Sequence, residues 1–547
     1  MSLPPSPASI IPEGTCRVAR AAFPKGNVFM RRRDALGLIS SAPPFASLCS
    51  QTGQPAQAPA RLALVLQFAE GLAGRQAADA VRSRLDWPYA LGLALTDPGF
   101  DDSVLREFRP RLIAGGGEHL LLETMPTYLQ ERGLLKARGQ QRTDSAPILA
   151  AIRTLNRLAW VGETMRFALN RLAAVAPAWV QTQRQPGWRA RYGARGEHYR
   201  LPRTEAERQR LAATIGADGF ALLPAVFAPE TPLEVRAEPA VEVLRRIWGR
   251  RYAGPDDPPR WRQDGEVPPS PRVIHAPDAL EARSSLKRGM ARIGYRVPVT
   301  ETCDADTPQV ITQVETTLAT APDDQMLDTI HAALAEHALL PHEPLVDCGD
   351  TDAEILVGSE REDGVAIVGP VAADPSWQAR EATGFANRAF TIDGEPHTAT
   401  CPQGKQRRKW QPDTDVAGQD VVHIRLAKTA GQACAVRVAC PRAKAEPRPL
   451  TVRTEGDQEV RQAARQRQTT VEFQEHDAKR AGIEGTLSQG VRALDRRRSR
   501  SMGLATTPLQ HILSAAAINL VRVVAWLTDP RPPKRRAAPL AALASAA

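Results

Sequence analysis

Three carboxylates that lie far apart in the chain have the residue types for metal-dependent phosphodiester chemistry. Asp347 ends the short apolar stretch EPLVD, and a glycine follows two residues later. Because ligands collect at the carboxyl ends of strands in α/β sheets, Asp347 is a site candidate. Asp144 lies in GQQRTDSAP and Glu484 lies in GIEG. Considered singly, the three could instead be a turn aspartate, a helix N-cap and an exposed helix glutamate.

Taken together, the three acids have a chemical logic. Mg²⁺ binds through a few carboxylates, completed by waters and phosphate oxygens. Two such ions can activate a water or a 3′-hydroxyl on one side of a phosphodiester and stabilise the leaving oxygen on the other. We therefore take Asp144, Asp347 and Glu484 as candidate catalytic and metal-binding residues, with Mg²⁺ or Mn²⁺ as the ion.

A basic segment follows Glu484 directly. The chain of 547 residues has a net charge of +10, which suggests a polyanionic partner, either nucleic acid or an acidic membrane surface. An arginine-rich composition without such a partner is the alternative, and a solvated helix end is the alternative for the segment itself. The candidate DNA-binding residues are Arg492, Arg496, Arg497, Arg498 and Arg500, with Lys287 and Arg288 in SSLKRGM.

The N-terminal half is expected to be mostly helical. Residues 1–60 are rich in proline and serine and predict an extended basic arm. Apolar periodicity over 61–135 predicts a small helical unit, either a DNA-binding domain or a plain helical bundle. The catalytic core would begin in 136–384, interrupted by a helical stretch and by a linker near 253–272.

The C-terminal half alternates strands and helices. Hairpin, helix, strand, helix and strand up to residue 384 predict a mixed α/β sheet. Pro298 falls in the first strand of that hairpin, and a proline is best tolerated at a sheet edge. Residues 385–455 predict a β-rich insertion, 456–527 return to helix and carry Glu484, and 528–547 predict a disordered basic tail.

Compartment and membrane association follow from weaker signals. The seven cysteines are loosely spaced, and the N-terminus lacks a signal-peptide pattern. The apolar run HILSAAAINLVRVVAWL contains His511, Asn519 and Arg522, so we expect it not to span a bilayer. A cytoplasmic protein without membrane contact is therefore expected.

Long segments of the chain resemble DDE transposases of bacterial insertion sequences, in the insertion-sequence family numbered 1182. The segments that carry the resemblance are RVARAAFPKGN, LQFAEGLAGRQAADAVRSRLDWPYALGLALTDPGFDDSVLREFR, QRTDSAPILAAIRTLNRL, SSLKRGMARIGYRVPVTETCDADTPQVITQVETT, LVDCGDTDAEIL and AGIEGTLSQGVRALDRRRSRSMGLATTPLQHILSAAAINLVR. Its three catalytic acids fall on Asp144, Asp347 and Glu484.

The resemblance implies a ribonuclease H-like catalytic core, an N-terminal helical domain and a β-rich insertion before the glutamate. It also implies binding of terminal inverted repeats in double-stranded DNA, cleavage with a divalent metal, and joining of the 3′-OH ends to target DNA. A homodimer or larger synaptic assembly at the bacterial nucleoid is expected, because two DNA ends are processed.

Several polar positions depart from the family pattern. Pro298 stands where the family has histidine, and Ser501, Thr506 and Pro508 replace tyrosine, lysine and histidine. Cys401, Cys434 and Cys440 could bind zinc, but Gly431 stands at the fourth cysteine position, so zinc is not expected. These departures keep open an alternative function: a catalytically decayed copy that acts only as a DNA-binding protein.

Overall fold

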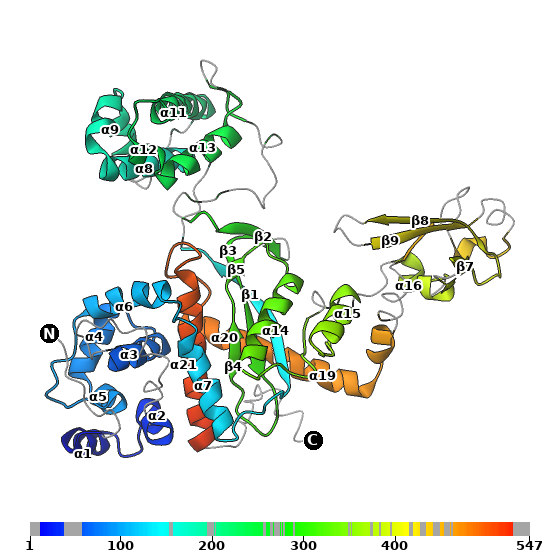
Figure 1. The fold of residues 1–547 in the computed structure, drawn as a ribbon, viewed down its shortest axis with the longest axis horizontal. Coiled ribbons are helices and arrows are strands. Elements are labelled where there is room, and N and C mark those ends of the chain that lie inside the picture. The colour runs from blue at the N-terminus through cyan, green and yellow to red at the C-terminus, as the bar shows by residue number, and fades with distance from the viewer. Residues whose placement is uncertain are drawn as a thin grey trace.

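The computed structural model describes most of the chain between residues 11 and 528. The described residues are 11–37, 57–151, 157–193, 202, 204–254, 259–262, 266, 274, 276, 279–287, 290–347, 351, 353–371, 376–381, 384–393, 397–414, 420–426, 434–440, 449–452, 460 and 463–528. Figure 1 shows a main body with two insertions that extend from it, one helical and one rich in strands.

The main body begins with a cluster of helices. These are α1 (Glu13–Ala22), α2 (Val28–Leu36), α3 (Gln57–Ala69), α4 (Gly74–Ser83), α5 (Asp86–Leu91), α6 (Asp102–Ala114) and α7 (Leu120–Glu131). The first two lie where an extended arm was predicted, so that prediction is wrong for residues 11–37. The Asn27 side chain caps α2 by accepting the backbone N–H groups of Phe29 and Met30, and both apolar side chains are buried. Residues 57–60 of the expected arm begin α3, and residues 1–10 and 38–56 lie outside the described residues.

A mixed sheet forms the centre of the main body. Its strands are β1 (Gln141–Leu149), β2 (Arg283–Lys287), β3 (Met290–Thr302), β4 (Ile311–Val314) and β5 (Thr317–Leu318). The long strand β3 pairs antiparallel with each of the other four. On the free edge of β1, Leu345 forms a parallel bridge to Arg142 and another to Val368. The sheet therefore continues past β1 through two short parallel segments.

Pro298 lies inside this sheet and not at its edge. It is opposite Ser145 of β1 on one side, and on the other side its carbonyl accepts the Glu315 N–H at 3.1 Å. Since proline has no N–H, it cannot return a bond to Glu315. The partner strand is accordingly divided into β4 and β5 beside it, which is how the ladder accommodates the proline.

The remaining helices of the main body cover the sheet. They are α14 (Leu327–Glu336), α15 (Ala353–Glu362), α19 (Val471–Ala481), α20 (Ile483–Leu494) and α21 (Thr507–Thr528), with a 3₁₀ turn η6 (Asp324–Met326). Helix α21 lies between the N-terminal helices and the sheet (Figure 1). One apolar core contains Leu64 of α3, Leu513 of α21 and Val299 of β3. Most of the N-terminal helical core is therefore shared with the sheet, apart from a small cluster of Ala19, Met30 and Tyr89.

Helix α21 contains the apolar run that was considered above as a possible membrane span. Within the described residues it alone is long and apolar enough to cross a bilayer, with a mean hydropathy of 1.5. The sequence expectation that this run is too short and too polar does not hold on those criteria. However, 67% of its apolar window is buried inside the protein, where α2, α3, α7 and β4 contact it. A core helix of a folded domain gives this result.

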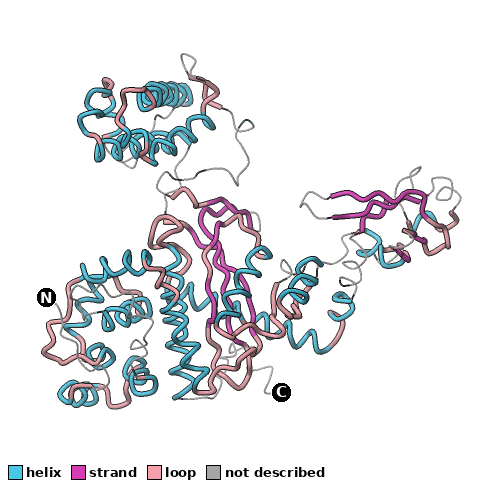
Figure 2. The backbone as a smooth tube through the Cα atoms, in the orientation of Figure 1, coloured by secondary structure: helices cyan, strands magenta, loops and turns pink. Residues whose placement is uncertain are grey.

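The helical insertion leaves the sheet after β1 and returns at β2. It contains α8 (Arg157–Val175), α9 (Pro177–Gln183), α10 (Trp188–Tyr192), α11 (Glu205–Val226), α12 (Leu233–Arg236) and α13 (Pro239–Arg251). A separate apolar core, with Trp160, Trp188 and Trp248, holds it together. In Figure 2 the described part of this insertion is drawn as helices and loops, and it lies at a distance from the strands of the main body.

Two glycines of α11 let aromatic side chains approach its backbone. The Trp248 ring lies against Gly219, and the Trp248 indole N–H donates to the Gly216 carbonyl at 3.0 Å. A Cβ at Gly219 would lie 2.1 Å from Cε2 of Trp248. The side chain of Trp248 is fully buried, so it has no room to move aside.

We expect Gly219→Ala to destabilise the helical insertion by about 1–3 kcal/mol, because it overpacks this core. Gly249→Ala is the matched control, since a Cβ there meets nothing within 4 Å and alanine favours a helix interior by up to about 1 kcal/mol. Thermal unfolding followed by tryptophan fluorescence compares the two. A Gly219→Ala transition at or above the wild-type temperature would contradict the expectation.

The second insertion is rich in strands. The strands β6 (Thr391–Asp393) and β7 (Thr398–Thr400) form a pair, and β8 (Arg407–Thr414), β9 (Asp420–Leu426) and β10 (Pro449–Val452) form a sheet in the order β10–β9–β8. Helix α16 (Trp377–Glu381) and the 3₁₀ turns η8 (Asn387–Ala389) and η9 (Arg437–Ala439) complete it. Figure 1 places it away from the main sheet.

Candidate active site

Asp144 and Asp347 follow paired positions on adjacent parallel segments. The Thr143 N–H donates to the Leu345 carbonyl at 2.9 Å, and the Leu345 N–H donates to the Gln141 carbonyl at 2.8 Å. Arg142 and Leu345 therefore lie side by side, and each aspartate comes two residues later. This register brings together two acids that are about 200 residues apart in the chain.

One guanidinium lies within the field of both aspartates. Arg480 of α19 has its Nη1 3.6 Å from Asp347 Oδ1, and its Nε donates to Asp477 Oδ1 at 2.7 Å. Burial lowers the pKa of Arg480, but the hydrogen bond to Asp477 and the charges of Asp477, Asp347 and Asp144 outweigh burial and raise that pKa. A cation is thus already paired with Asp347, and the charge of Asp144 also acts on it.

The two aspartates differ in their surroundings. Asp144 is partly buried on β1, and its Oδ1 accepts the backbone N–H of Ser145 at 2.6 Å. The Asp347 side chain keeps 56% of its surface exposed, at the open end of its segment. An incoming ligand can therefore reach Asp347 directly.

Glu484 is not gathered with these two acids. It is the second residue of α20 and is exposed, although α20 packs on β1. Across the residues that the structure describes, no three His, Cys, Asp or Glu side chains lie close enough to hold one metal ion. The convergence of all three acids on a metal thus stays a prediction.

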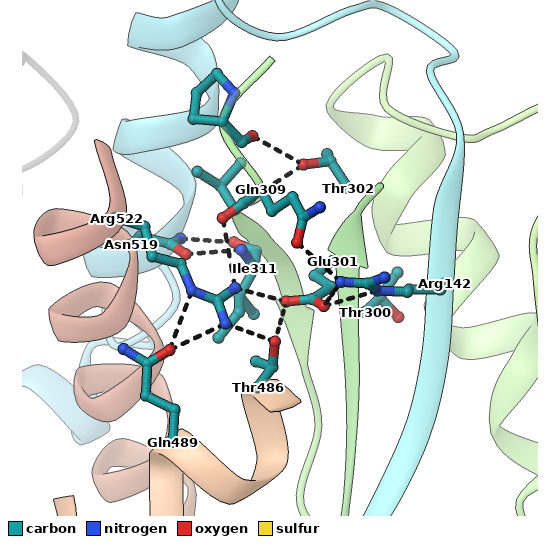
Figure 3. A network of polar contacts seen from close by, with 12 residues as sticks. Arg142, Thr300, Glu301, Thr302, Gln309, Ile311, Thr486, Gln489, Asn519 and Arg522 are labelled. Carbon is teal, nitrogen blue, oxygen red and sulfur yellow. Dashed lines mark hydrogen bonds and ion pairs between the residues drawn. The ribbon is translucent and has the colours of Figure 1, made fainter. Parts of the chain in front are cut away.

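A buried ionic cluster includes Arg142, two residues before Asp144 on β1 (Figure 3). Its centre is Glu301 of β3, whose side chain is fully buried. One carboxylate oxygen accepts Arg142 Nε at 2.8 Å, and the other accepts Thr486 Oγ1 at 2.6 Å and Arg522 Nη1 at 2.7 Å. Gln309 and Gln489 bind the outer sides of the two guanidinium groups. Strands β1 and β3 and helices α20 and α21 therefore meet at one carboxylate.

The basic segment after α20 runs along the far end of β1. The Leu149 N–H donates to the Arg497 carbonyl at 2.9 Å, and the Ser499 N–H donates to the Leu149 carbonyl at 2.7 Å. Arg492, Arg497, Arg498 and Arg500 are exposed. The guanidinium carbon of Arg500 also lies 5.1 Å from the centroid of the Phe68 ring. These backbone hydrogen bonds therefore fix the position of the segment that carries Arg497 and Arg498 against β1.

Arg496 is the exception in this segment. It was expected at a DNA surface, but only 2% of it is exposed, beside the fully buried His511. Burial lowers its pKa to about 10. The cause is local: Asp495 has a left-handed backbone (φ 51°) that turns the chain inward after α20, and Gly490 leaves space for the Arg496 side chain. Arg496 therefore has an interior position in place of the expected surface one.

Two further candidates lie at the β2–β3 hairpin. Lys287 is the last residue of β2 and is paired with Met290. Arg288 lies outside the described residues. The tip exposes apolar side chains as well, with Leu286 at 75% and Met290 at 56% exposure.

The cysteines of the β-rich insertion have contacts of their own. Cys401 and Cys440 pack against the same apolar cluster, and Cys401 Sγ accepts the Lys405 N–H at 3.3 Å. His423 lies 3.0 Å from Thr451, through Nδ1 and Oγ1. Gly431 falls outside the described residues.

Comparison with protein families gives two matches. Residues 400–524 match the family described as "Transposase DDE domain", and residues 18–111 match "Transposase domain (DUF772)". These matches support a DDE transposase. Both families indicate a function in transposition. A search of curated proteins and a search of solved structures gave no match.

The matched ranges cover different parts of the transposase architecture. The DDE domain match contains Glu484, helices α19 and α20, and nearly all of α21. The other match lies within the N-terminal helices. Asp144 and Asp347 lie outside both ranges, so their assignment depends on their sequence context and their geometry.

The sequence analysis missed Arg480, Arg142 and Glu301. A signal existed for Glu301, because a carboxylate in the strand VPVTET must be paired if it is buried. Arg522 gave the complementary signal, a charge within an apolar helix. Nothing local, however, pairs Glu301 with Arg522, because 221 positions separate them.

Proposed function

We propose that this protein is a transposase that binds the terminal inverted repeats of its insertion sequence, cleaves phosphodiester bonds with a divalent metal and joins the 3′-OH ends to target DNA. Membership of the insertion-sequence family numbered 1182 is part of the proposal. The observation that carries it is the placement of Asp144 and Asp347 on adjacent parallel segments. The negative charges of both aspartates help to raise the pKa of Arg480.

A ribonuclease H-like core is the fold we propose for the centre. Its support is a sheet in which β1 has an antiparallel neighbour, β3, on one side and two parallel segments, at Leu345 and Val368, on the other. One acid lies within β1, another at the end of the adjacent parallel segment, and a helix that carries a glutamate packs on β1. The strand order provides two of the three catalytic positions.

The strand aspartates fit a divalent cation, because Asp347 already pairs with a positive charge and both carboxylates offer the oxygen ligands that Mg²⁺ and Mn²⁺ take. Asp144 and Asp347 would hold the ion, with Glu484 as the third ligand. The ion would supply Lewis-acid activation of the attacking hydroxyl and of the phosphate. Asp144 is oriented by the Ser145 N–H, and Asp347 is open to the incoming DNA.

DNA would approach along the exposed arginines. Arg492, Arg497, Arg498 and Arg500 would bind backbone phosphates, and Lys287 and Arg288 would extend this surface at the β2–β3 hairpin. The N-terminal helices would read the inverted repeats, and two copies of the chain would pair two DNA ends at the nucleoid. The β-rich insertion is not proposed to bind zinc.

The test is cleavage of a DNA fragment that carries the element's own terminal inverted repeats, with Mg²⁺ or Mn²⁺. Specific 3′-OH ends from the wild-type protein, and their joining to a target plasmid, are the expected result. Specific binding without cleavage would favour a decayed copy that only binds DNA. The observation that favours this second candidate is that, among the described residues, no group of three acidic, His or Cys side chains could hold a metal ion.

Arg480 should compete with metal ions for the aspartates. In Arg480→Gln the two carboxylates lose their resident cation, so Mn²⁺ should raise the melting temperature more than it does in wild type. Arg82→Gln, which breaks an exposed pair with Asp79, is the control for loss of an arginine charge. A smaller Mn²⁺-induced shift in Arg480→Gln than in wild type would count against the aspartates as metal ligands.

The exposed arginines should contribute salt-sensitive affinity without sequence preference. Replacing Arg497 and Arg498 by alanine should lower the slope of log affinity against log salt by about one for each lost phosphate contact. Fluorescence anisotropy at several salt concentrations measures this slope. Arg496→Ala is the informative comparison, because its buried guanidinium should leave the salt slope unchanged.

A further inference from the structure

We propose that Glu301 is a positioning residue for the catalytic reaction. Its carboxylate would set the place of helices α19 and α20, and with them Arg480 and Glu484, against the strand that carries Asp144. This inference rests on the proposed function.

The first step of the argument is the link between Glu301 and β1. Arg142 binds the Glu301 carboxylate through Nε at 2.8 Å and Nη2 at 2.6 Å. Asp144 is two residues further along β1 and therefore has its side chain on the same face of the strand. Glu301 therefore fixes the Arg142 side chain on the face of β1 that also carries the side chain of Asp144, and helices α19 and α20 contact this strand.

The second step is the link from Arg142 to the helix junction. Arg142 Nη1 donates to the carbonyl of Lys479, the residue before Arg480. Gly482, between α19 and α20, packs so closely on Arg142 that a Cβ would lie 2.0 Å from Nη1. The junction that carries Arg480 and Glu484 therefore sits on the guanidinium that Glu301 holds.

The third step is a direct bond to α20. Thr486, one half-turn after Glu484, donates to Glu301 Oε2 at 2.6 Å, and its hydroxyl oxygen accepts Arg522 Nη2 at 2.6 Å. Two guanidinium groups share one fully buried carboxylate, with side-chain exposures of 6% for Arg142 and 20% for Arg522. Removing that negative charge leaves both cations without their main counter-charge.

The test compares Glu301→Gln and Thr486→Val with wild type in the full-length protein. Thr164→Val is the matched control, because its hydroxyl is equally buried but bonds only the Trp160 carbonyl of its own helix, in the helical insertion. Three quantities are measured below the melting temperature of every variant: the single-turnover cleavage rate, the dissociation constant for inverted-repeat DNA, and Mn²⁺ binding by electron paramagnetic resonance.

We expect Glu301→Gln to cut the cleavage rate by about 100-fold, the cost of misplacing a catalytic group by about 1 Å, and to weaken Mn²⁺ binding. DNA affinity should stay close to the wild-type value, since backbone hydrogen bonds to Leu149 of β1 hold the segment of Arg497 and Arg498 independently of α20. Thr486→Val should change rate and Mn²⁺ binding in the same direction by a smaller factor, with no change of charge. Thr164→Val should match wild type in all three quantities.

A folded Glu301→Gln protein with wild-type rate and Mn²⁺ affinity would overturn the inference. If Glu301→Gln does not fold, Thr486→Val decides, and wild-type behaviour of that variant overturns the inference. When the wild-type protein itself neither cleaves nor binds Mn²⁺, the proposed function has failed and the inference falls with it. That outcome is distinct, because it is seen without any substitution.

Discussion

Asparagine at position 144 or 347 should abolish metal-dependent cleavage while leaving the fold and DNA binding intact. Each substitution removes one carboxylate charge from the pair that would hold the ion, which costs several kcal/mol of transition-state stabilisation, a rate loss of about a thousandfold or more. The fold should tolerate the change because the pair between Asp347 and Arg480 is 3.6 Å long and Asp347 is 56% exposed, so it contributes little to stability.

Single-turnover cleavage and DNA anisotropy measure the two effects separately. Asp328→Asn is the matched control, an exposed aspartate in the first turn of α14, and it should cleave at the wild-type rate. Glu484→Gln belongs in the same series. A loss like that of the strand aspartates would mean that α20 brings its glutamate to the metal. Wild-type rates in Asp144→Asn and Asp347→Asn would refute the assignment of both acids.

Alanine at position 482 should have the second largest effect, on stability and on cleavage together. A Cβ at Gly482 would lie 2.0 Å from Arg142 Nη1 and 2.7 Å from its Cζ. Arg142 cannot yield freely, because Glu301, Gln309 and the Lys479 carbonyl all hold its guanidinium. We expect a loss of about 2 kcal/mol or more, from overpacking and from strain on a buried ion pair.

Gly485→Ala is the control for this substitution. Gly485 lies in α20, three residues after Gly482, a Cβ there meets nothing within 4 Å, and alanine should stabilise α20 by up to about 1 kcal/mol. Thermal unfolding of the two variants should therefore shift in opposite directions. Equal shifts would show that glycine at 482 is not required by the close approach to Arg142.

Local pattern alone predicted many of the elements. The structure has strands in both arms of the predicted hairpin, helices from α8 to α13, strands in the β-rich insertion, and helices around Glu484. These are segments in which apolar spacing or turn residues act over a few positions. Asp144, however, lies in strand β1, so the alternative that it is a helix N-cap is wrong. Two glycines near Glu484 allow close approach to the backbone, Gly482 by Arg142 and Gly490 by Arg496.

Two of the failures of the sequence analysis were decided by partners elsewhere in the chain. Helices α1 and α2 replace the expected arm because their buried side chains pack within the N-terminal helices and on α21. Pro298 occupies an interior strand because β4 and β5 separate beside it. The third failure has a local cause, since Arg496 turns inward where Asp495 reverses the chain beside Gly490.

The sequence by itself determined the element types, the basic character of the chain and the resemblance to DDE transposases, because these depend on composition, short-range periodicity and motif. Only the tertiary structure decided that Asp144 and Asp347 lie on adjacent parallel segments, that Glu484 stays exposed, and that Glu301 joins two strands to two helices. The physical reason is that strand register and buried charge pairing act between residues that are hundreds of positions apart.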